Sequence, residues 1–402
     1  MTSALTGNSP AGPYAEAKAR LAAAVEAARP EIVELCHRVH ANPEPAFEEH
    51  QAAAWVAEAV ARHGYRVEHP AGRLATAVRA TLRGGQGDGG PRIGILAEYD
   101  ALPGLGHGCG HNTMAASGVG AAIALAGLAP ELPGEIVFLG TPAEERGSGK
   151  QFMIDDGLFE GLDAALLFHP SDRNRAACAL LASVDVEVIF AGQQAHAAAD
   201  PWQGRNALDA LIMLFGSVGL WRQQLRPTSR VHGIVLEGGT AANIIPDRAA
   251  GRFMLRSDDQ AYYEQMRERF AQMAQAAALA SDCQVETVFT GGSSTMRDNA
   301  VLRERFVANM AAYGVADNPI DYERLGSSDM GNVSQQLPAI HPELAICDEG
   351  VAGHSIQFRD AAATPRAEET TLLAATLVAQ TAYELFADPQ LVEEAWRAFR
   401  DG

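Results

Sequence analysis

One glycine-rich run of the 402-residue sequence, residues 106–112, holds Cys109 and His111 two positions apart. Glycine lets a backbone approach a ligand closely, and a thiolate and an imidazole are good ligands for zinc and similar metals. The same run also fits a loop with a buried cysteine and a hydrogen-bonded histidine, which is the commoner meaning of a lone Cys-x-His pair. The pair therefore indicates a metal site only in company with other ligands.

Two adjacent carboxylates, Glu144 and Glu145, follow the turn-forming residues 140–142. One carboxylate there could bind a metal while its neighbour accepts a proton from a metal-bound water. A solvated acidic turn is the ordinary alternative, although the preceding Gly-Thr-Pro places the pair in a tight turn and not on a helix face.

Two further histidines have positions that fit a ligand. His169 follows the apolar run at 164–168, and His354 has a glycine beside it. A lone histidine is more often structural, so neither is persuasive alone. Together with Cys109, His111 and Glu145 they supply five donors, which suits two metal ions that share a bridging group. Two such ions ~4 Å apart can hold and activate one water between them.

The elements that must position these residues are apolar runs ending in polar clusters, at 92–97, 135–139 and 163–168. The runs alternate with helical segments such as 113–128. Continuous apolar strands alternating with helices predict an α/β layer with a mostly parallel, buried sheet. Ligands bind beyond the carboxyl ends of the strands in such sheets, and the polar clusters occupy those ends.

The pattern changes near Leu181, where valines alternate with acidic residues over 184–188, as in a half-buried strand. The elements expected after it give the order β-α-β-β-α-β, the split βαβ pattern. We therefore expect a compact second domain at 182–293, inserted in a first domain formed by 1–181 and 294–402.

Bulk composition restricts the function. The formal net charge of −19 argues against nucleic acid and anionic membrane surfaces as partners. The five cysteines are odd in number and irregularly spaced, which favours a reducing, cytoplasmic compartment. The alanine-rich stretch at 115–128 is expected to be too short and too small-sided to cross a membrane.

Seven motifs together resemble the M20 family of metallopeptidases and amidohydrolases, over residues from about Pro30 to Phe386. Within that family the sequence is similar to the aminoacylase-like branch that includes p-aminobenzoyl-glutamate hydrolase. Asn112, where aminoacylase-like members often carry aspartate, fits the latter group. The motifs are EYDALPG at 98–104, HGCGHN at 107–112, GTPAEE at 140–145, GQQAHA at 192–197, NIIPD at 243–247, SSDM at 327–330 and GH at 353–354.

The resemblance implies an α/β fold with a mixed, mostly parallel sheet sandwiched by helices, as in di-zinc peptidases. It implies that the inserted domain is a ferredoxin-like α+β lid and dimerisation domain in a homodimer. The strand at 183–189 or the helix from Asn206 is the expected dimer contact. Two divalent ions, zinc or manganese, would be held by Cys109, His111, Glu145, His169 and His354, with Cys109 as the bridge in place of an aspartate.

The resemblance also implies the roles of the remaining site residues. Glu144 would be the general base and then the acid, and Asn243 would contact the substrate. His196 would polarise the scissile carbonyl, in its own active site or in that of the partner protomer. Arg205 could meet a substrate carboxylate, but a solvated residue at a helix start is the preferred interpretation.

The implied activity is hydrolysis of the amide bond in a small N-acyl amino acid, a p-aminobenzoyl-glutamate-like compound or a dipeptide, by a metal-bridging hydroxide. A dipeptidase acting on an unusual dipeptide is the alternative. A cysteine hydrolase using Cys109 is disfavoured, because His111 is too near in sequence to be its obvious base. A non-catalytic metal-binding regulatory protein would be expected to have lost Glu144 or a ligand.

Overall fold

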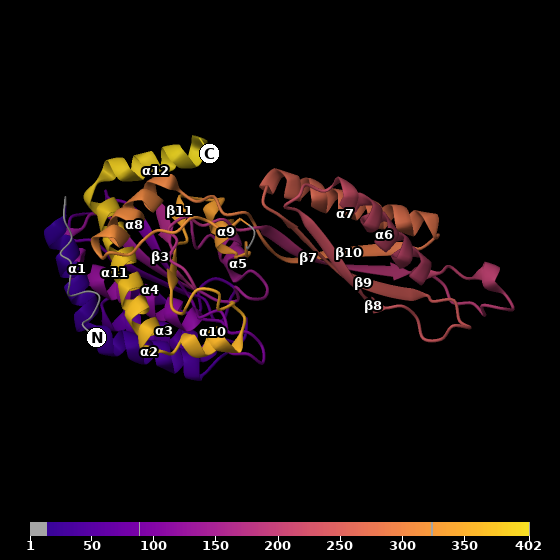
Figure 1. The fold of residues 1–402 in the computed structure, drawn as a ribbon, viewed down its shortest axis with the longest axis horizontal. Helices are drawn as coiled ribbons and strands as arrows, with labels where there is room; N and C mark the ends of the chain where they lie inside the picture. The colour runs from indigo at the N-terminus through magenta and orange to yellow at the C-terminus, as the bar shows by residue number, and fades with distance from the viewer. Residues whose placement is uncertain (1–13, 88, 323–324, 402) are drawn as a thin grey trace. The chain divides into compact units, whose positions relative to one another are not determined.

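The computed structural model describes residues 14–87, 89–322 and 325–401, which form two compact units (Figure 1). The first unit takes the described residues of Met1–Ala179 and Met296–Gly402. The second unit is the continuous segment Leu180–Thr295. Each unit has its own hydrophobic core.

The first unit is built on a six-stranded sheet in the order β1-β2-β4-β3-β5-β11. The ladders from β4 through β3 and β5 to β11 are parallel, whereas β1 and β2 add antiparallel pairs at one side. Nearly all side chains of β3 and β4 are buried, as the continuous apolar runs predicted. The strands are β1 Arg66–Glu68, β2 Val78–Arg83, β3 Arg92–Glu98, β4 Glu135–Thr141, β5 Ala164–Leu166 and β11 Ala339–Ile340, and a small parallel pair joins β6 His169–Ser171 to β12 Glu343–Ala345.

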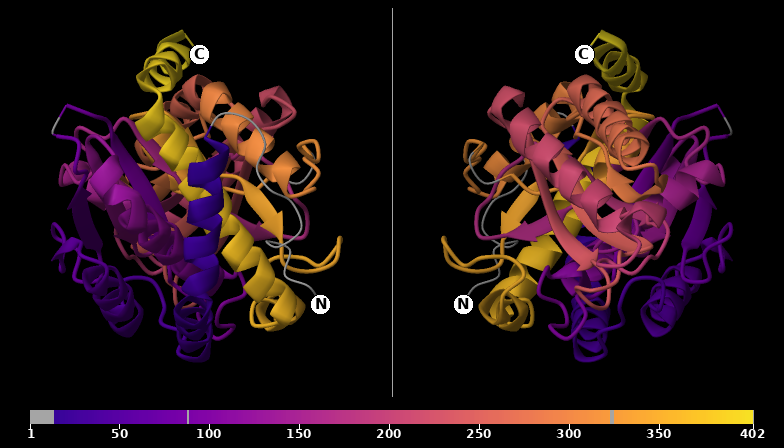
Figure 2. Two further views of the ribbon diagram at one scale, coloured as in Figure 1. Left: turned by 90° about the vertical axis from the view of Figure 1, so that its left-hand side faces the viewer. Right: turned by 90° about the vertical axis from the view of Figure 1, so that its right-hand side faces the viewer.

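Helices pack around this sheet, which confirms the mixed α/β class with a mostly parallel sheet (Figures 1 and 2). The helix α4, His111–Leu128, lies against β3 and β4 and also contacts α2 and α11. The other helices are α1 Ala15–Ala27, α2 Arg29–Ala41, α3 His50–Arg62, α5 Gly149–Asp155, α8 Ala300–Ala312, α9 Met330–Ser334, α10 Ile356–Ala361, α11 Pro365–Ala387 and α12 Pro389–Asp401.

Small side chains let α4 lie close to its neighbours. A Cβ at Gly118 would come within 2.8 Å of the Ala97 Cβ, and one at Gly120 within 2.8 Å of Ile32. The helical stretch His111–Glu131 is long and apolar enough to cross a membrane, contrary to the expectation from residues 115–128. The most apolar window of this stretch is 83% buried, as a core helix of a globular unit would be.

The second unit has the predicted β-α-β-β-α-β order and folds into a four-stranded antiparallel sheet in the order β10-β7-β9-β8. Two helices cover one face of this sheet (Figure 1). Side chains alternate between buried and partly exposed along β7, so the helices bury one face only. The elements are β7 Ala182–Ala191, α6 Ala207–Trp221, β8 Arg230–Glu237, β9 Arg248–Ser257, α7 Gln260–Ala280 and β10 Gln284–Ser293.

The strand order corrects one of the two expected dimer contacts. Residues 183–189 belong to β7, which pairs with β10 on one side and with β9 on the other. Both rows of its backbone hydrogen-bonding groups are thus occupied, and this strand cannot pair with a second chain. The edges of the sheet are β8 and β10.

Candidate metal centre

The carboxyl ends of three sheet strands position the candidate residues of the first unit. β3 ends at Glu98, β4 ends at Thr141 shortly before the Glu144–Glu145 pair, and β5 ends at Leu166 shortly before His169. His111 is the first residue of α4, directly after Gly110, whose φ of 78° suits a residue without a side chain. The edge predicted for ligand binding therefore carries these groups.

Cys109 belongs to two groups of ligand-type atoms. With His111 and His169 it forms one group, and with Glu145 and His354 it forms a second; within each group all the atoms lie within 4.8 Å of one another. Cys109 Sγ lies 3.5 Å from His169 Nε2, and His354 Nε2 lies 3.5 Å from Glu145 Oε2. The five expected ligands are thus together, with the thiol placed where a shared ligand would be.

The expected general base lies beside these groups. Glu144 Oε2 is 3.9 Å from His111 Nε2, and the two side chains form a third ligand-type group with Glu98. Burial raises the pKa of Glu144 well above its ordinary value, and the nearby carboxylates of Glu98 and Glu145 raise it further. Burial likewise raises the pKa of Glu145 and of the Cys109 thiol. A cluster of buried acidic groups of this kind matches the positive charge of divalent ions.

The donors fit two divalent ions. His111 Nε2 and Glu145 Oε1 are buried and have no hydrogen-bond partner among the described residues. The Nδ1 atoms of His111 and His169 face the Asp100 carboxylate and the Pro170 carbonyl, which leaves both Nε2 atoms for a cation. Donor atoms of one tetrahedral zinc ion lie ~3.3–3.6 Å apart, given its bond lengths. The 3.5 Å pairs above have that separation.

Two buried carboxylates hold the backbone of this site. Asp100 Oδ1 contacts His111 Nδ1 at 2.9 Å, and its Oδ2 accepts the Glu145 N–H at 2.8 Å. Glu49 Oε1 accepts the N–H of Ala143 at 2.8 Å. Ala143 has the unusual φ of 59°, so the Glu49 contact fixes a strained turn directly before Glu144.

Three charged residues at this site had no role assigned from their sequence patterns. Lys150 is fully buried, and its Nζ donates to Glu98 Oε1 at 2.5 Å and to Asp329 Oδ1 at 2.6 Å. Burial alone would lower the pKa of Lys150, but the carboxylates of Asp329 and Glu98 outweigh it and raise that pKa. Glu98 and Asp329 each lie in one of the seven motifs, which was the available signal. Lys150 had none beyond its place after a glycine.

His196 and Asn243 belong to the second unit, where a short β-bridge brings their segments side by side. The Ala197 N–H donates to the Asn243 carbonyl at 3.0 Å, and residue 196 pairs with Ile244. His196 Nδ1 accepts the N–H groups of Ala198 at 3.2 Å and Ala199 at 3.1 Å. A neutral His196 ring therefore carries its proton on Nε2, where it is a donor. Both side chains are exposed.

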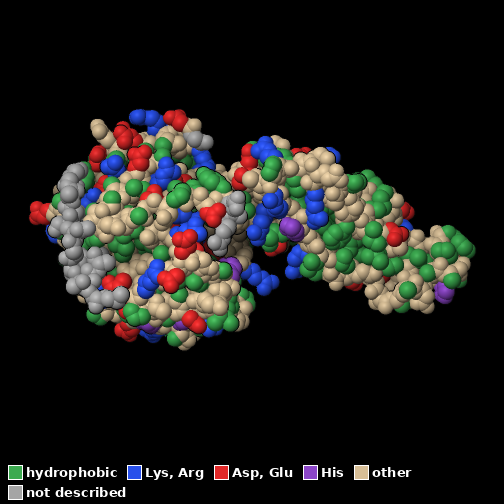
Figure 3. Space-filling view, in the orientation of Figure 1, with side chains coloured by type: hydrophobic (Ala, Val, Ile, Leu, Met, Phe, Trp, Pro, Cys, Tyr) green, Lys and Arg blue, Asp and Glu red, His purple; other side chains and the backbone are tan. Residues whose placement is uncertain are grey.

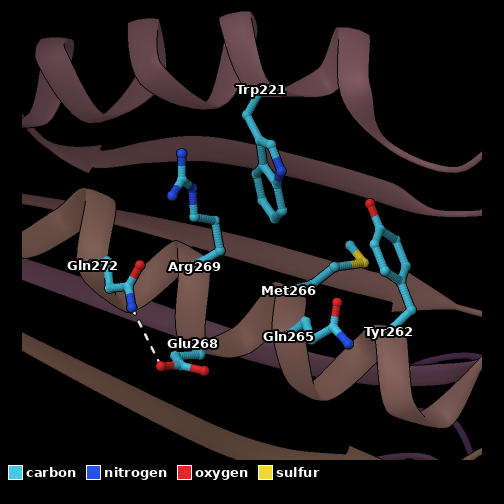
Figure 4. Close-up of a pocket in the computed structure, with 7 residues that line it drawn as sticks. All are labelled: Trp221, Tyr262, Gln265, Met266, Glu268, Arg269 and Gln272. Carbon is cyan, nitrogen blue, oxygen red and sulfur yellow. Dashed lines mark hydrogen bonds between the residues drawn. The ribbon is translucent and has the colours of Figure 1, made fainter.

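A separate pocket of about 290 Å³ lies on the second unit between Trp221, at the end of α6, and α7 (Figure 4). Gln272 Nε2 donates to Glu268 Oε1 at 3.3 Å along its rim. None of the predicted site residues lines this pocket, which is formed by Trp221, Tyr262, Gln265, Met266, Glu268, Arg269 and Gln272.

Comparisons with known proteins agree with the geometry. Residues 94–376 match the model of peptidase family M20/M25/M40. The chain is 36% identical to the Xaa-Arg dipeptidase of Homo sapiens over 94% of this chain and 90% of that protein. It is 28% identical to a p-aminobenzoyl-glutamate hydrolase chain of Escherichia coli (strain K12) over 92% of each.

Solved structures share the fold at lower sequence identity. A dinuclear metal-binding peptidase of the M20 family from Bacillus subtilis superposes with a TM-score of 0.65 at 20% identity, covering 87% of this chain and 98% of that one. An aminobenzoyl-glutamate utilization protein from Klebsiella pneumoniae gives a TM-score of 0.66 at 21% identity, with 87% and 96% covered.

Proposed function

This chain belongs to peptidase family M20/M25/M40, whose members are metal-dependent hydrolases of C–N bonds, and on that premise we propose that it cleaves the amide bond of a dipeptide or a small N-acyl amino acid at the cluster around Cys109. The observation that carries the proposal is the position of Cys109 Sγ, which is shared by the group with His111 and His169 and the group with Glu145 and His354.

The relatives suggest which substrates to test first. The relative at 36% identity is named for dipeptides that end in arginine, and the relative at 28% for p-aminobenzoyl-glutamate. Both alignments cover at least nine-tenths of each chain. We therefore place dipeptides with a basic second residue first, and p-aminobenzoyl-glutamate and other N-acyl amino acids second.

Two divalent ions would be held by the expected ligands Cys109, His111, Glu145, His169 and His354. Such ions, when bound, supply a polarised water and a Lewis acid for the scissile carbonyl. A soft thiolate and the imidazoles favour zinc, whereas the carboxylate also suits manganese. We propose zinc, with manganese as the alternative.

The chain's own residues would move the protons. Glu144 would accept a proton from the attacking water and pass it to the leaving amine. Its neighbour Glu145 is anchored through its N–H to Asp100, which also restrains Glu144. His196 would donate from Nε2 to the substrate carbonyl oxygen, and loss of one such donor typically costs ~3 kcal/mol of transition-state stabilisation. Asn243, joined to the segment of His196 by the β-bridge, would contact the substrate.

The second unit offers a surface for a homodimer. Exposed apolar side chains lie on the outer side of α6 and along the edge strand β8, and Figure 3 shows hydrophobic side chains gathered over this unit. The two elements adjoin, because Arg222 Nε donates to the Val231 carbonyl at 2.8 Å. An apolar edge strand is a template for pairing with another chain. The exposed residues are Ile212, Met213 and Leu220 on α6 and Ile234, Val235 and Leu236 on β8.

The proposed compartment is the cytoplasm. All five cysteines lie in the described part of the chain, and none forms a disulfide. Unpaired thiols, one of them in the metal centre, are suited to a reducing environment.

A substrate panel tests the proposed function. The metal-free protein is reconstituted with zinc or manganese, and amine release is followed with ninhydrin for Xaa-Arg and Xaa-Lys dipeptides, p-aminobenzoyl-glutamate and N-acetyl amino acids. We expect metal-dependent release from at least one class, lost on chelation and restored by metal. A protein that binds two ions and cleaves no panel member would contradict the substrate class. Activity that resists chelation but is lost on thiol alkylation would favour a cysteine hydrolase.

A further inference from the structure

A buried ion-pair group lies directly behind the metal centre and has no part in the proton transfers described above. Lys150 is fully buried and bridges Glu98, the last residue of β3, to Asp329, which precedes α9. Both carboxylates are also buried, with exposed fractions of 0% for Glu98 and 1% for Asp329. The three charges come from segments far apart in the chain, so the fold holds Glu98 in a fixed position.

The two carboxylates differ in what their second oxygen does. Asp329 uses both oxygens on Lys150, Oδ1 for the ammonium and Oδ2 for the backbone N–H at 2.9 Å. Glu98 gives only Oε1 to Lys150. Its Oε2 is buried and has no hydrogen-bond partner among the described residues. If Glu98 were only a counter-ion for Lys150, nothing would require this second oxygen to remain unsatisfied in a buried position.

The free oxygen of Glu98 faces a metal ligand. Oε2 lies 3.4 Å from His111 Nε2, which is also without a hydrogen-bond partner among the described residues. Because Nδ1 of His111 faces the Asp100 carboxylate, the Nε2 of a neutral ring is a lone-pair donor. Two lone pairs that face each other at this distance need a cation between them, and 3.4 Å lies within the ~3.3–3.6 Å separation of two ligands on one zinc ion.

We propose that Glu98 is a sixth protein ligand of the dinuclear centre, binding through Oε2 the same ion as His111, with Lys150 as the positioning residue that holds its other oxygen. This inference rests on the proposed function, since it assigns a ligand to the same metal centre. The ion of His111 then has four protein donors, from Cys109, His111, His169 and Glu98. The ion of Glu145 and His354 has three and keeps an open position, as catalytic zinc sites do.

Two neutral variants separate a ligand from a counter-ion. Glu98→Gln and Asp329→Asn each remove one negative charge from Lys150, but only Glu98→Gln removes the oxygen that faces His111. Metal-free wild type and variants are titrated with zinc by calorimetry, and the zinc that remains after dialysis is measured by elemental analysis. We expect wild type and Asp329→Asn to retain two ions per chain, and Glu98→Gln to retain one. We also expect an affinity for the second ion at least ~100-fold weaker in Glu98→Gln, beyond the 10–100-fold range of partners outside the coordination sphere.

Two results would overturn the inference while leaving the proposed function intact: retention of both ions by Glu98→Gln, or equal losses in the two variants, which would mean that charge alone matters. A wild-type chain that binds no zinc or manganese would instead refute the proposed function. Circular dichroism of the metal-free proteins checks folding. If Glu98→Gln does not fold, Glu98→Asp serves in its place, because it keeps the charge but withdraws the oxygen, and it should lose the same ion.

Discussion

Asp100 Oδ2 accepts the backbone N–H of Glu145 at 2.8 Å. Its other oxygen, Oδ1, lies 2.9 Å from Nδ1 of His111. One buried carboxylate thus orients the imidazole of one expected ligand and the backbone of another, on segments that follow different strands. The carboxylate also makes the His111 ring a more basic donor at Nε2.

The first prediction concerns Asp100→Asn. The amide oxygen can still accept one of the two hydrogen bonds, but the negative charge beside His111 is lost, so the metal affinity should fall ~10–100-fold. A competition titration against a chromophoric chelator measures the affinity. Asp163→Asn is the matched control, because Asp163 Oδ2 accepts the Arg92 N–H at 2.8 Å at the opposite end of β3. An affinity equal to that of the control would contradict the role of Asp100.

A second prediction separates chemistry from metal binding at Glu144. Glu144→Gln keeps the size of the side chain but cannot accept the proton of the attacking water, so kcat should fall ~10²–10⁴-fold. Two ions per chain should remain by elemental analysis, because Glu144 is not among the expected ligands. Turnover near that of wild type would exclude Glu144 as the general base, and loss of metal would make it a ligand.

A third prediction compares two thiols. Cys109→Ala removes the atom shared by both ligand groups, so the protein should lose most of its metal. Cys178→Ala is the control, since Cys178 is 6% exposed and lies outside those groups. Elemental analysis after dialysis gives the metal content of each variant. Equal contents in the two variants would remove Cys109 from the ligand set.

The core of the first unit was predictable because β3 and β4 are buried on both faces and therefore read as continuous apolar runs. The lateral order of strands was not predictable. β2 lies between β1 and β4 and is antiparallel to both, although it precedes β3 in the chain. Local periodicity describes which faces of a strand are buried but not which strand lies beside it.

The metal centre shows the same division. Cys109, His111 and Glu145 lie in short motifs whose residue types point to ligands, whereas Lys150 pairs with Glu98 across 52 positions and with Asp329 across 179. Only tertiary structure joins such partners. A buried lysine cannot be told from a solvated one by its immediate neighbours in the sequence.

A fourth prediction gives the pH dependence of stability. Burial first, and then the nearby Asp100 carboxylate, raise the pKa of Glu49 from 4.5 to about 7. Between these values the folded protein binds more protons than the unfolded chain, so Glu49 lowers stability as the pH rises through this window. Glu49→Gln removes the titration. The free energy of unfolding of wild type should therefore fall by about 2–3 kcal/mol more than that of the variant between pH 5 and pH 8.

Urea titrations of the metal-free proteins at the two pH values measure this difference. Comparing the variant with wild type cancels the other titrating groups, which both proteins share. Equal pH dependence in the two proteins would show that Glu49 has an ordinary pKa in the folded state.

The last prediction concerns the proposed dimer surface on the second unit. Leu220 on α6 is 70% exposed and belongs to the apolar surface next to β8, whereas Leu279 on α7 is 74% exposed and lies outside it. In a dimer formed through α6 and β8, Leu220→Glu would bury an unpaired carboxylate, which costs several kcal/mol. Leu279→Glu makes the same chemical change at a solvated position, so it should leave assembly unchanged.

Light scattering coupled to size-exclusion chromatography measures the mass of each protein. Wild type and Leu279→Glu should elute as dimers of the 42.5 kDa chain, and Leu220→Glu as the monomer. If all three are monomers, the chain does not dimerise. If all three are dimers, the contact lies elsewhere, and the apolar side chains of α6 and β8 then need another partner. Because α6 and β8 adjoin, Ile234→Glu on the edge strand should reproduce the effect of Leu220→Glu, and a dimeric Ile234→Glu would limit the interface to the helix.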